Sequence, residues 1–158
     1  MRTTCLINSY NYRKFVTDAV ASALHQTVPF DEVILVDDGS TDGSLEAVLD
    51  RFDGEPTLKI IAKENGGQLS CFQAGWEAST GDVVFFLDAD DLYEPEYLAE
   101  TLRIYQAEPE VDFVFVHYCE CGPAGAQCQA RDLPDRDFGY TLLPALFTGQ
   151  WLGAPTSC

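Results

Sequence analysis

The chain has 158 residues, of which 46% are hydrophobic and 22% are charged. This length and balance predict a globular protein with a single core and exclude a disordered chain or a fibrous repeat. Nine basic residues stand against 26 acidic ones, giving a formal net charge of −17. Such a surface repels phosphate backbones, so we expect no nucleic-acid partner, and a phosphorylated ligand would need a cation between itself and the protein. No apolar run reaches the roughly 18 residues of a membrane span, which predicts a cytoplasmic chain without a span and leaves open peripheral attachment to the inner face of a membrane.

Cysteine and histidine residues give little indication of a metal or catalytic site. The only cysteine cluster is Cys119, Cys121 and Cys128. Its spacing lacks the paired ligands of a zinc site, so we expect reduced thiols. His25 ends a predicted helix and His117 ends a predicted strand, and both are interpreted as structural, with His117 the better functional candidate.

Apolar runs rich in Val, Ile and Phe alternate with stretches of helical periodicity. That alternation is typical of βαβ units and predicts an α/β fold, a three-layer α/β/α arrangement around a mainly parallel sheet. The predicted strands are residues 3–8, 32–36, 58–62, 82–87 and 111–117. The predicted helices are residues 13–25, 45–52, 68–79 and 94–105. Ser40 or Thr41 is the expected N-cap of the second helix. Residues 118–136 predict a long loop, and residues 140–147 a weaker helix.

Polar residues follow three of the predicted strands at the point where each strand ends. They are residues 8–11 (NSYN), 37–40 (DDGS) and 88–91 (DADD). Each group alone is explained equally well as a turn or a helix entry. In open α/β sheets, however, ligands bind outside the carboxyl ends of the strands. Three polar strand ends at one edge of the sheet therefore predict a binding site.

The acidic group at residues 88–91 predicts a metal site. On an extended backbone, Asp88 and Asp90 would point to the same side, where two carboxylates repel unless a cation lies between them. Mg²⁺ binds through one or two carboxylates together with substrate phosphates. A solvent-exposed acidic turn is the alternative.

Four motifs, in order and spacing, resemble the family 2 glycosyltransferases of the GT-A fold. These enzymes transfer a sugar from a nucleotide diphosphate sugar with inversion at the anomeric carbon. The motifs are residues 6–12 (LINSYNY) with 22–27 (SALHQT), 36–42 (VDDGSTD), 65–67 (NGG) and 87–91 (LDADD) followed by Pro95. The likeness covers residues 3 to about 118. Residues 71–73 (CFQ) depart from the Ala-Arg-Asn that the family often has there, which puts a basic donor contact in doubt.

The resemblance implies roles for individual residues. Asn8 and Tyr10 would flank the nucleobase, and one of Asp37 and Asp38 would hydrogen-bond the base or the ribose. Further nucleotide-sugar contacts are implied at Asn65, Gly67, Asp88 and Ala89. Asp88 and Asp90 form the implied metal motif, with Asp90 holding the Mn²⁺ or Mg²⁺ that grips the diphosphate. The implied partners are a UDP-, GDP- or dTDP-linked sugar and a saccharide or lipid-linked acceptor, as in polysaccharide biosynthesis.

The resemblance also implies what the chain lacks. We expect one glycosyltransferase-like domain over residues 1–158, with a nucleotide-sugar-binding core at 3–118 and a loop and the start of an acceptor-side region at 119–158. The carboxylate that deprotonates the acceptor normally lies beyond Cys158, so no catalytic base is assigned. A fragment that binds nucleotide sugar without turning it over is therefore the alternative to an active transferase.

Other α/β enzymes agree less well with the sequence. Paired aspartates after a strand also occur in receiver domains and in phosphatases of the haloacid dehalogenase type. A receiver would need a Lys where His117 and Tyr118 stand, and the phosphatase would need its Asp-x-Asp on the first strand. No Gly-x-Gly-x-x-Gly follows the first strand, which excludes a Rossmann dehydrogenase.

Overall fold

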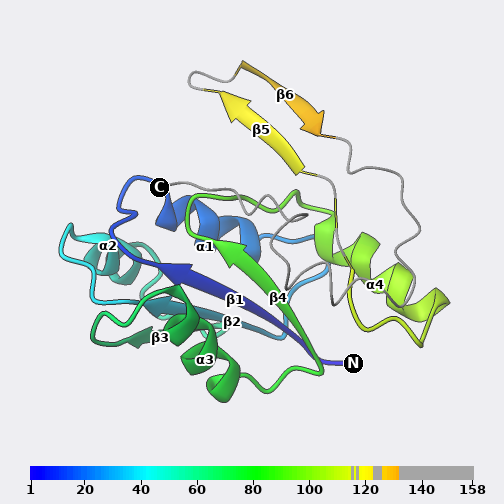
Figure 1. Cartoon of the computed structure of the whole chain (residues 1–158), viewed down its shortest axis with the longest axis horizontal. Coiled ribbons are helices and arrows are strands. Elements are labelled where there is room, and N and C mark those ends of the chain that lie inside the picture. Colours follow the sequence, from blue (N-terminus) through cyan, green and yellow to red (C-terminus); the bar gives the residue numbers. More distant parts are fainter. Residues whose placement is uncertain (115, 117, 123–125, 132–158) are drawn as a thin grey trace. The chain divides into compact units, whose positions relative to one another are not determined.

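The structure, a computed structural model, describes residues 1–114, 116, 118–122 and 126–131. The chain divides into two compact units, Met1–Asp112 and Phe113–Cys158. The described elements are β1 (Thr3–Ser9), α1 (Val16–Leu24), β2 (Glu32–Asp37), α2 (Ser44–Arg51), β3 (Leu58–Ala62), α3 (Gln68–Ala78), β4 (Val83–Asp88), α4 (Tyr97–Ala107), β5 (Tyr118–Gly122) and β6 (Ala126–Arg131). Strands β1 to β4 and the four helices belong to the first unit (Figure 1).

The first unit is built on a parallel four-stranded sheet with the order β3-β2-β1-β4. The predicted α/β fold with a mainly parallel sheet is thus confirmed. The register aligns the carboxyl ends of β1, β2 and β4. Asn8 of β1 pairs with Asp88 of β4, and Ser9 of β1 pairs with Asp37 of β2. These pairings place the polar strand ends of the sequence side by side.

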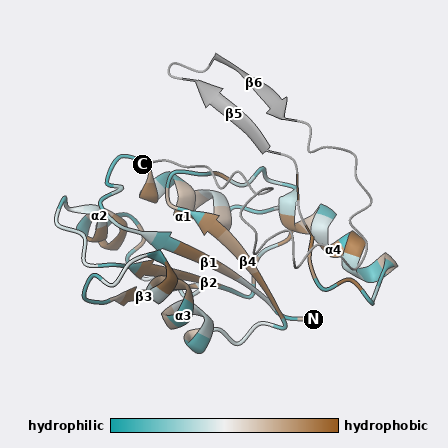
Figure 2. Cartoon of the chain, viewed as in Figure 1, coloured by the Kyte–Doolittle hydropathy of each residue, from teal (hydrophilic) through white to brown (hydrophobic). Residues whose placement is uncertain are grey.

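The two faces of the sheet are covered by different helices. Alternate residues of the strands point to opposite faces, so Cys5 and Ile7 pack with α1, α2 and α4, whereas Leu6 packs with Cys71 of α3. Figure 1 shows α1 and α3 on opposite sides of the sheet. In Figure 2 the strands of this sheet are its most consistently apolar segments, as expected for parallel strands buried on both faces.

Helix α3 lies unusually close to β1 because Gly75 has no side chain. A Cβ atom at Gly75 would come within 2.4 Å of Leu6 Cδ1. Both residues are buried, Leu6 at 0% exposure. The absence of a side chain at residue 75 therefore allows the close approach of α3 to β1.

Most predicted elements are present, with small shifts at their ends. The strand predicted at residues 58–62 has the bounds of β3. Helix α1 begins at Val16 rather than residue 13, after a turn in which the amides of Phe15 and Val16 both donate to the Tyr12 carbonyl. No helix of the described residues is long and apolar enough to cross a membrane.

The fifth strand predicted at residues 111–117 is wrong for the described part of that range. Residues 111–114 and 116 are not in a strand, and residues 115 and 117 lie outside the description. Phe113 is 60% exposed and Val116 is 43% exposed. Alternating apolar residues resemble a strand in sequence, but a parallel strand needs a pairing partner and burial on both faces, and these residues have neither among those described.

The long loop predicted from residue 118 is also wrong. Strands β5 and β6 form an antiparallel pair, with Tyr118 opposite Arg131 and Cys119 opposite Ala130. Gly and Pro between two short segments are as typical of a hairpin as of a loop, and the sequence alone does not separate the two. The helix predicted at residues 140–147 lies outside the described residues, as do residues 132–136.

Candidate functional site

The candidate site lies at the carboxyl edge of the parallel sheet, where β1, β2 and β4 end. Ser9 and Asp37 are each only 2% exposed, and Asn8 and Asp88 are half-buried. In the register these four residues are adjacent. The sheet therefore brings together Asn8, Asp37 and Asp88, three of the residues that the sequence predicts for this site.

Three buried side-chain atoms at this edge have no hydrogen-bond partner among the described residues. They are Asn8 Oδ1, Ser9 Oγ and Asp37 Oδ1. The second carboxylate oxygen of Asp37 accepts a bond from the Ser40 amide at 2.9 Å. Buried polar atoms are normally paired, so a group of three without partners indicates that a polar ligand or water completes the site. The sequence analysis included Ser9 in the polar group at residues 8–11 but assigned it no individual role.

Asp38 is held by contacts that join the end of β2 to the loop after β3. Its Oδ1 accepts from Lys63 Nζ at 2.5 Å and from the Gly66 amide at 2.9 Å, and its Oδ2 accepts from the Gly67 amide at 2.7 Å. Burial disfavours the charged carboxylate, but these donors outweigh it and hold the pKa of Asp38 below its usual value. Asp38 thus positions the loop that carries Asn65 and Gly67.

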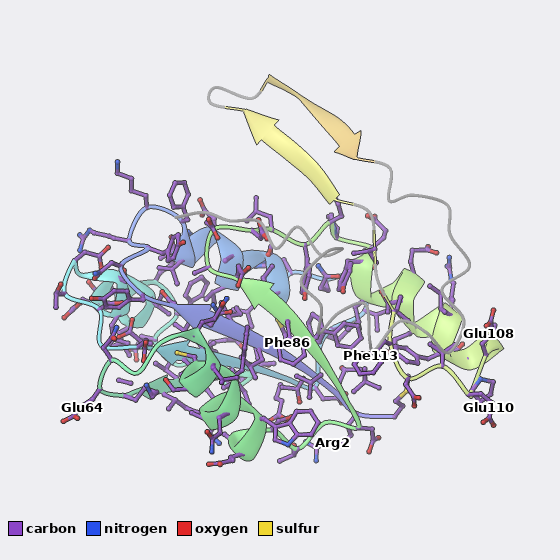
Figure 3. The ribbon with its side chains drawn as sticks, in the orientation of Figure 1. Arg2, Glu64, Phe86, Glu108, Glu110 and Phe113 are labelled. Carbon is purple, nitrogen blue, oxygen red and sulfur yellow. The ribbon has the colours of Figure 1, made fainter. Side chains whose placement is uncertain are left out.

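The loop at residues 63–67 packs closely against the turn that follows β2. A Cβ atom at Gly39 would lie 3.1 Å from the Asn65 amide nitrogen and 3.2 Å from the Lys63 carbonyl oxygen. Asn65 and Gly67 are both exposed at the edge of the sheet, and Figure 3 labels the neighbouring Glu64 in the same loop. The backbone of Asn65 and Gly67 is therefore held in place, while both residues remain accessible to a ligand.

The loops after β1 and β2 are joined by hydrogen bonds. The Asn11 amide donates to Ser40 Oγ at 2.9 Å, and the Thr41 amide donates to Asn11 Oδ1 at 2.8 Å. The expected N-cap at Ser40 or Thr41 is therefore wrong: α2 begins at Ser44, whose amide donates to Asp42 Oδ1. The joined loops leave the Tyr10 side chain 46% exposed beside the strand ends.

The acidic residues after β4 lie in a turn. The Asp91 amide donates to the Asp88 carbonyl at 3.0 Å, so the backbone is not extended through Asp90 and the alternation argument from the sequence does not hold there. Partial desolvation, together with the charges of Asp90 and Asp88, raises the pKa of Asp91. The carboxylates are thus close enough to repel one another.

No basic side chain of the described residues neutralises this acidic turn. The ion pairs among the described residues involve other acids: Asp18, Asp38, Asp82 and Glu100. The Asp88 carboxylate accepts a hydrogen bond only from Gln68, whose Nε2 donates to Asp88 Oδ1 at 3.2 Å. Ala89, also predicted for the site, is 1% exposed and packs in the core, so only its backbone could reach a ligand.

The acidic turn has the donor chemistry for a divalent cation. Carboxylate oxygens suit Mg²⁺ and Mn²⁺, and a cation would relieve the repulsion among Asp88, Asp90 and Asp91, which together with the larger effect of desolvation raises the pKa of Asp91. Within the described residues, however, no group of three or more acidic, histidine or cysteine side chains could hold a metal alone. The turn therefore fits a cation whose coordination is completed by ligand phosphates rather than a protein cage.

Comparison with known proteins identifies the family. Residues 4–147 match the family model "Glycosyl transferase family 2". Over 112 residues the chain is 38% identical to an uncharacterized glycosyltransferase of Nostoc sp., covering 70% of this chain and 35% of the relative. Over 120 residues it is 32% identical to chondroitin synthase of Pasteurella multocida, covering 76% of this chain and 12% of the relative. The chain thus spans about a third of the first relative and about an eighth of the second.

Solved structures agree. The chain superimposes on S. aureus TarS in complex with UDP-GlcNAc with a TM-score of 0.63 and 27% identity, covering 69% of this chain and 32% of that one. It superimposes on a mannosyltransferase of Pyrobaculum calidifontis in complex with GDP-Man and Mn²⁺ with a TM-score of 0.64 and 28% identity, covering 70% and 33%. Fold, sequence motifs and family model agree, and the chain belongs to glycosyl transferase family 2.

Proposed function

We propose that the protein transfers a sugar from a nucleotide diphosphate sugar to a saccharide or lipid-linked acceptor, with a divalent cation between the protein and the diphosphate. The observation that carries this proposal is the row of unneutralised oxygens at one sheet edge. It runs from the unpaired Asn8 Oδ1 and Asp37 Oδ1 to the Asp88–Asp91 turn. A chain of net charge −17 can hold a diphosphate there only with a cation between them.

The nucleoside end of the donor would lie over β1 and β2. Tyr10 offers an exposed ring for the base, and Asn8 offers an unpaired amide oxygen. Asp37 has a free carboxylate oxygen for a base N–H or a ribose hydroxyl, whereas the oxygens of Asp38 already accept bonds from Lys63, Gly66 and Gly67. Asp38 would contact the nucleoside either through a further hydrogen bond beside these three or by replacing one of them. Asn65 and Gly67 would approach the donor from the neighbouring loop.

The diphosphate end would lie at the acidic turn. Asp90 and Asp88 would hold Mn²⁺ or Mg²⁺, and Asp88 would also reach the ribose or the donor sugar, with the backbone of Ala89 alongside. When bound, the cation would neutralise the diphosphate and act as a Lewis acid that stabilises the departing nucleoside diphosphate. The protein's own residues hold the diphosphate in place and fix the direction in which the sugar faces the acceptor.

The bound ligands of the solved relatives support a nucleotide-sugar donor. TarS was solved with UDP-GlcNAc, and the mannosyltransferase with GDP-Man and Mn²⁺. The two relatives differ in the base, so UDP, GDP and dTDP are all candidates for this chain. The acceptor is left open, and so is the residue that removes its proton.

A calorimetric titration tests this proposal. UDP, GDP and dTDP are each titrated into the protein with Mn²⁺, with Mg²⁺ and with EDTA. We expect one nucleotide to bind in the presence of metal and to lose most of that affinity in Asp90→Asn. The control is Asp50→Asn, which removes an exposed carboxylate on α2 that makes no polar contact with the described residues and lies outside the candidate site.

The outcomes separate the hypotheses. Equal affinities with metal and with EDTA for all three nucleotides would refute the metal-bridged donor site. Metal-dependent binding combined with hydrolysis or transfer of the matching nucleotide sugar supports an active transferase. Metal-dependent binding with no release of nucleotide from any sugar donor supports the alternative, a nucleotide-sugar-binding module that is catalytically incomplete.

A further inference from the structure

Gln26, just beyond the end of α1, is a buried polar side chain whose bonds reach across to the segment after the acidic turn. It is 8% exposed. Its Nε2 donates to the Ser22 carbonyl at 3.0 Å and to the Glu94 carbonyl at 2.9 Å, and its Oε1 accepts from the Leu98 amide at 3.0 Å. All three bonds have normal geometry, and two of them join residues 68 and 72 positions apart in the chain.

Two neighbours of Gln26 bind the same segment. Ser22 Oγ accepts from the Tyr93 amide at 3.1 Å. Thr27 donates to the Pro95 carbonyl twice, from its amide at 2.8 Å and from its hydroxyl at 3.1 Å. We call Ser22, Gln26 and Thr27 the α1 clamp. The clamp accounts for three of the four polar residues of the 22–27 motif, the fourth being His25, and the proposed function gives none of them a role.

The clamp fixes the far end of the acidic turn. The near end is fixed because Asp88 belongs to β4, which pairs with β1. At the far end, the clamped Tyr93 also donates its hydroxyl to the Phe86 carbonyl at 2.7 Å and stacks on Tyr97 with ring centroids 3.9 Å apart. Phe86, on β4, is labelled in Figure 3. Residues 89–92 therefore connect two anchored points.

We propose that Gln26 is a positioning residue for the metal-binding turn and sets the position of Asp90 through the clamped backbone of residues 93–98. This inference rests on the proposed function, because it assumes that the turn binds a cation. Among the described residues, no side chain donates a hydrogen bond to the carboxylates of Asp90 or Asp91, and the Asp88 carboxylate receives one only from Gln68. Anchors outside the turn must therefore hold the carboxylates in the geometry that a cation requires.

The loss of this anchor should weaken binding of the cation more than binding of the nucleoside. Residues that orient metal ligands without touching the metal typically change metal affinity by about 10- to 100-fold when they are replaced. Asn8 and Asp37, which are proposed to contact the nucleoside, lie at the ends of β1 and β2, and Tyr10 directly follows β1. The hydrogen bonds from the clamp to other segments go to residues 93–98 instead. A residue that merely supported the fold would affect both kinds of binding alike.

The test compares Gln26→Met with a matched control. Methionine keeps the length of the side chain but removes both donors and the acceptor. Gln73→Met is the same change on the exposed face of α3, where the amide contacts only Glu77. In the full chain, the probes are UDP and GDP, titrated with Mn²⁺ and with EDTA. We expect the affinity gained from Mn²⁺ to fall about tenfold or more in Gln26→Met, with binding in EDTA unchanged and the control like the wild type.

A second readout does not depend on nucleotide binding. Hydrogen exchange reports the Asp91 amide, which closes the turn by donating to the Asp88 carbonyl. We expect this amide to exchange about tenfold faster in Gln26→Met, while core amides of β1 keep their wild-type rates. Ser22→Ala removes the hydroxyl that accepts from the Tyr93 amide and donates to the Ala19 carbonyl within α1, and it is the second variant if Gln26→Met does not fold. It should shift the same amide in the same direction.

The two readouts distinguish the possible failures. Unchanged Asp91 exchange in a folded Gln26→Met protein overturns the clamp, whatever the titrations give. A parallel loss of binding with Mn²⁺ and with EDTA also overturns it, because that result describes a general loss of structure. Faster Asp91 exchange in a protein whose wild type shows no metal-dependent binding refutes the proposed function, and with it the role of the clamp in metal binding.

Discussion

The ammonium of Lys63 lies 2.5 Å from the carboxylate of Asp38, which joins the residue after β3 to the residue after β2. The pair is mostly shielded from water, since the Asp38 side chain is 3% exposed and that of Lys63 is 23% exposed. Lys63 Nζ also donates to the Glu64 carbonyl and to Ser70 Oγ, at 2.6 Å and 2.8 Å. One cation in a strongly acidic chain thus holds the loop that leads into α3.

We expect Lys63→Met to lower the free energy of unfolding by about 2 kcal/mol. The substitution leaves a buried carboxylate without its cation, which is typically worth about 3–5 kcal/mol for a fully buried pair, but Lys63 is partly exposed and Asp38 keeps two amide donors. Lys14→Met, at an exposed lysine in the turn before α1, is the control. Urea unfolding measures both, and equal stabilities for the two variants would contradict the expectation.

The same contacts predict how stability changes in acid. The folded-state pKa of Asp38 is lowered, so the unfolded chain binds more protons than the folded chain between the two pKa values. The stabilisation from Asp38 is therefore complete above the ordinary Asp value of about 3.9 and is lost as the pH falls through the lower folded value. The stability of Asp38→Asn should differ most from the wild type at pH 7 and least near pH 3. A constant difference across that range would count against the charge as the cause.

Local pattern predicted most of the first unit. Strand β2 is buried along nearly its whole length, so its continuous apolar run at residues 33–36 was enough to find it. The edge strands β3 and β4 are only partly buried, but their Val, Ile and Phe residues still marked them. The polar ends after β1, β2 and β4 were also predictable, because a strand end at the ligand edge is marked by Asn, Asp and Gly. The same pattern failed at residues 111–117, where apolar alternation lacks a partner strand among the described residues.

The contacts that position the site could not be predicted from local sequence. Lys63 meets Asp38 across 25 positions, and Gln26 meets Leu98 across 72. In the sequence alone, Lys63 looks like any surface lysine and Gln26 like any glutamine at the end of a helix. Their partners become evident only once the order of the strands is known. The turn at Asp90 was missed for a different reason: the sequence gives the end of an apolar strand only to within a residue or two, and side-chain direction depends on that residue.

Gly67→Ala should disturb the loop at residues 63–67 without any steric clash. Gly67 has φ +83° and ψ 167°, a conformation nearly restricted to glycine, and a Cβ atom there would meet nothing within 4 Å. The strain of about 1–3 kcal/mol would be relieved by turning the amide that now donates to Asp38 Oδ2. We expect lower stability and weaker nucleotide binding by calorimetry.

Gly54→Ala is the control for Gly67→Ala. Gly54 also has a positive φ, +78°, and open space around a built Cβ, but it lies between α2 and β3, away from the strand ends of the candidate site. Its substitution should lower stability by a similar amount and leave nucleotide affinity unchanged. If both alanines weakened nucleotide binding equally, loss of stability alone would explain the result for Gly67.

The contact between α3 and β1 gives a prediction about packing. Gly75→Ala would place a methyl group 2.4 Å from Leu6 Cδ1, inside a region where Leu6 is fully buried. Overpacking of this kind typically costs about 1–3 kcal/mol, which exceeds the gain of up to about 1 kcal/mol from replacing glycine by alanine in a helix. The net result should be a loss of stability of about 1–2 kcal/mol, measured by urea unfolding.

A double-mutant cycle with Leu6 identifies the cause of that loss. Leu6→Ala alone should cost about 2–5 kcal/mol because it leaves a cavity beneath α3. In the double variant the new methyl group of residue 75 would enter that cavity, so the two losses should not add, and the coupling should exceed about 1 kcal/mol. Strict additivity would mean that α3 moves away from the sheet instead. In that case the start of α3, where Gln68 meets Asp88, should move as well, and weaker metal-dependent nucleotide binding in Gly75→Ala would report it.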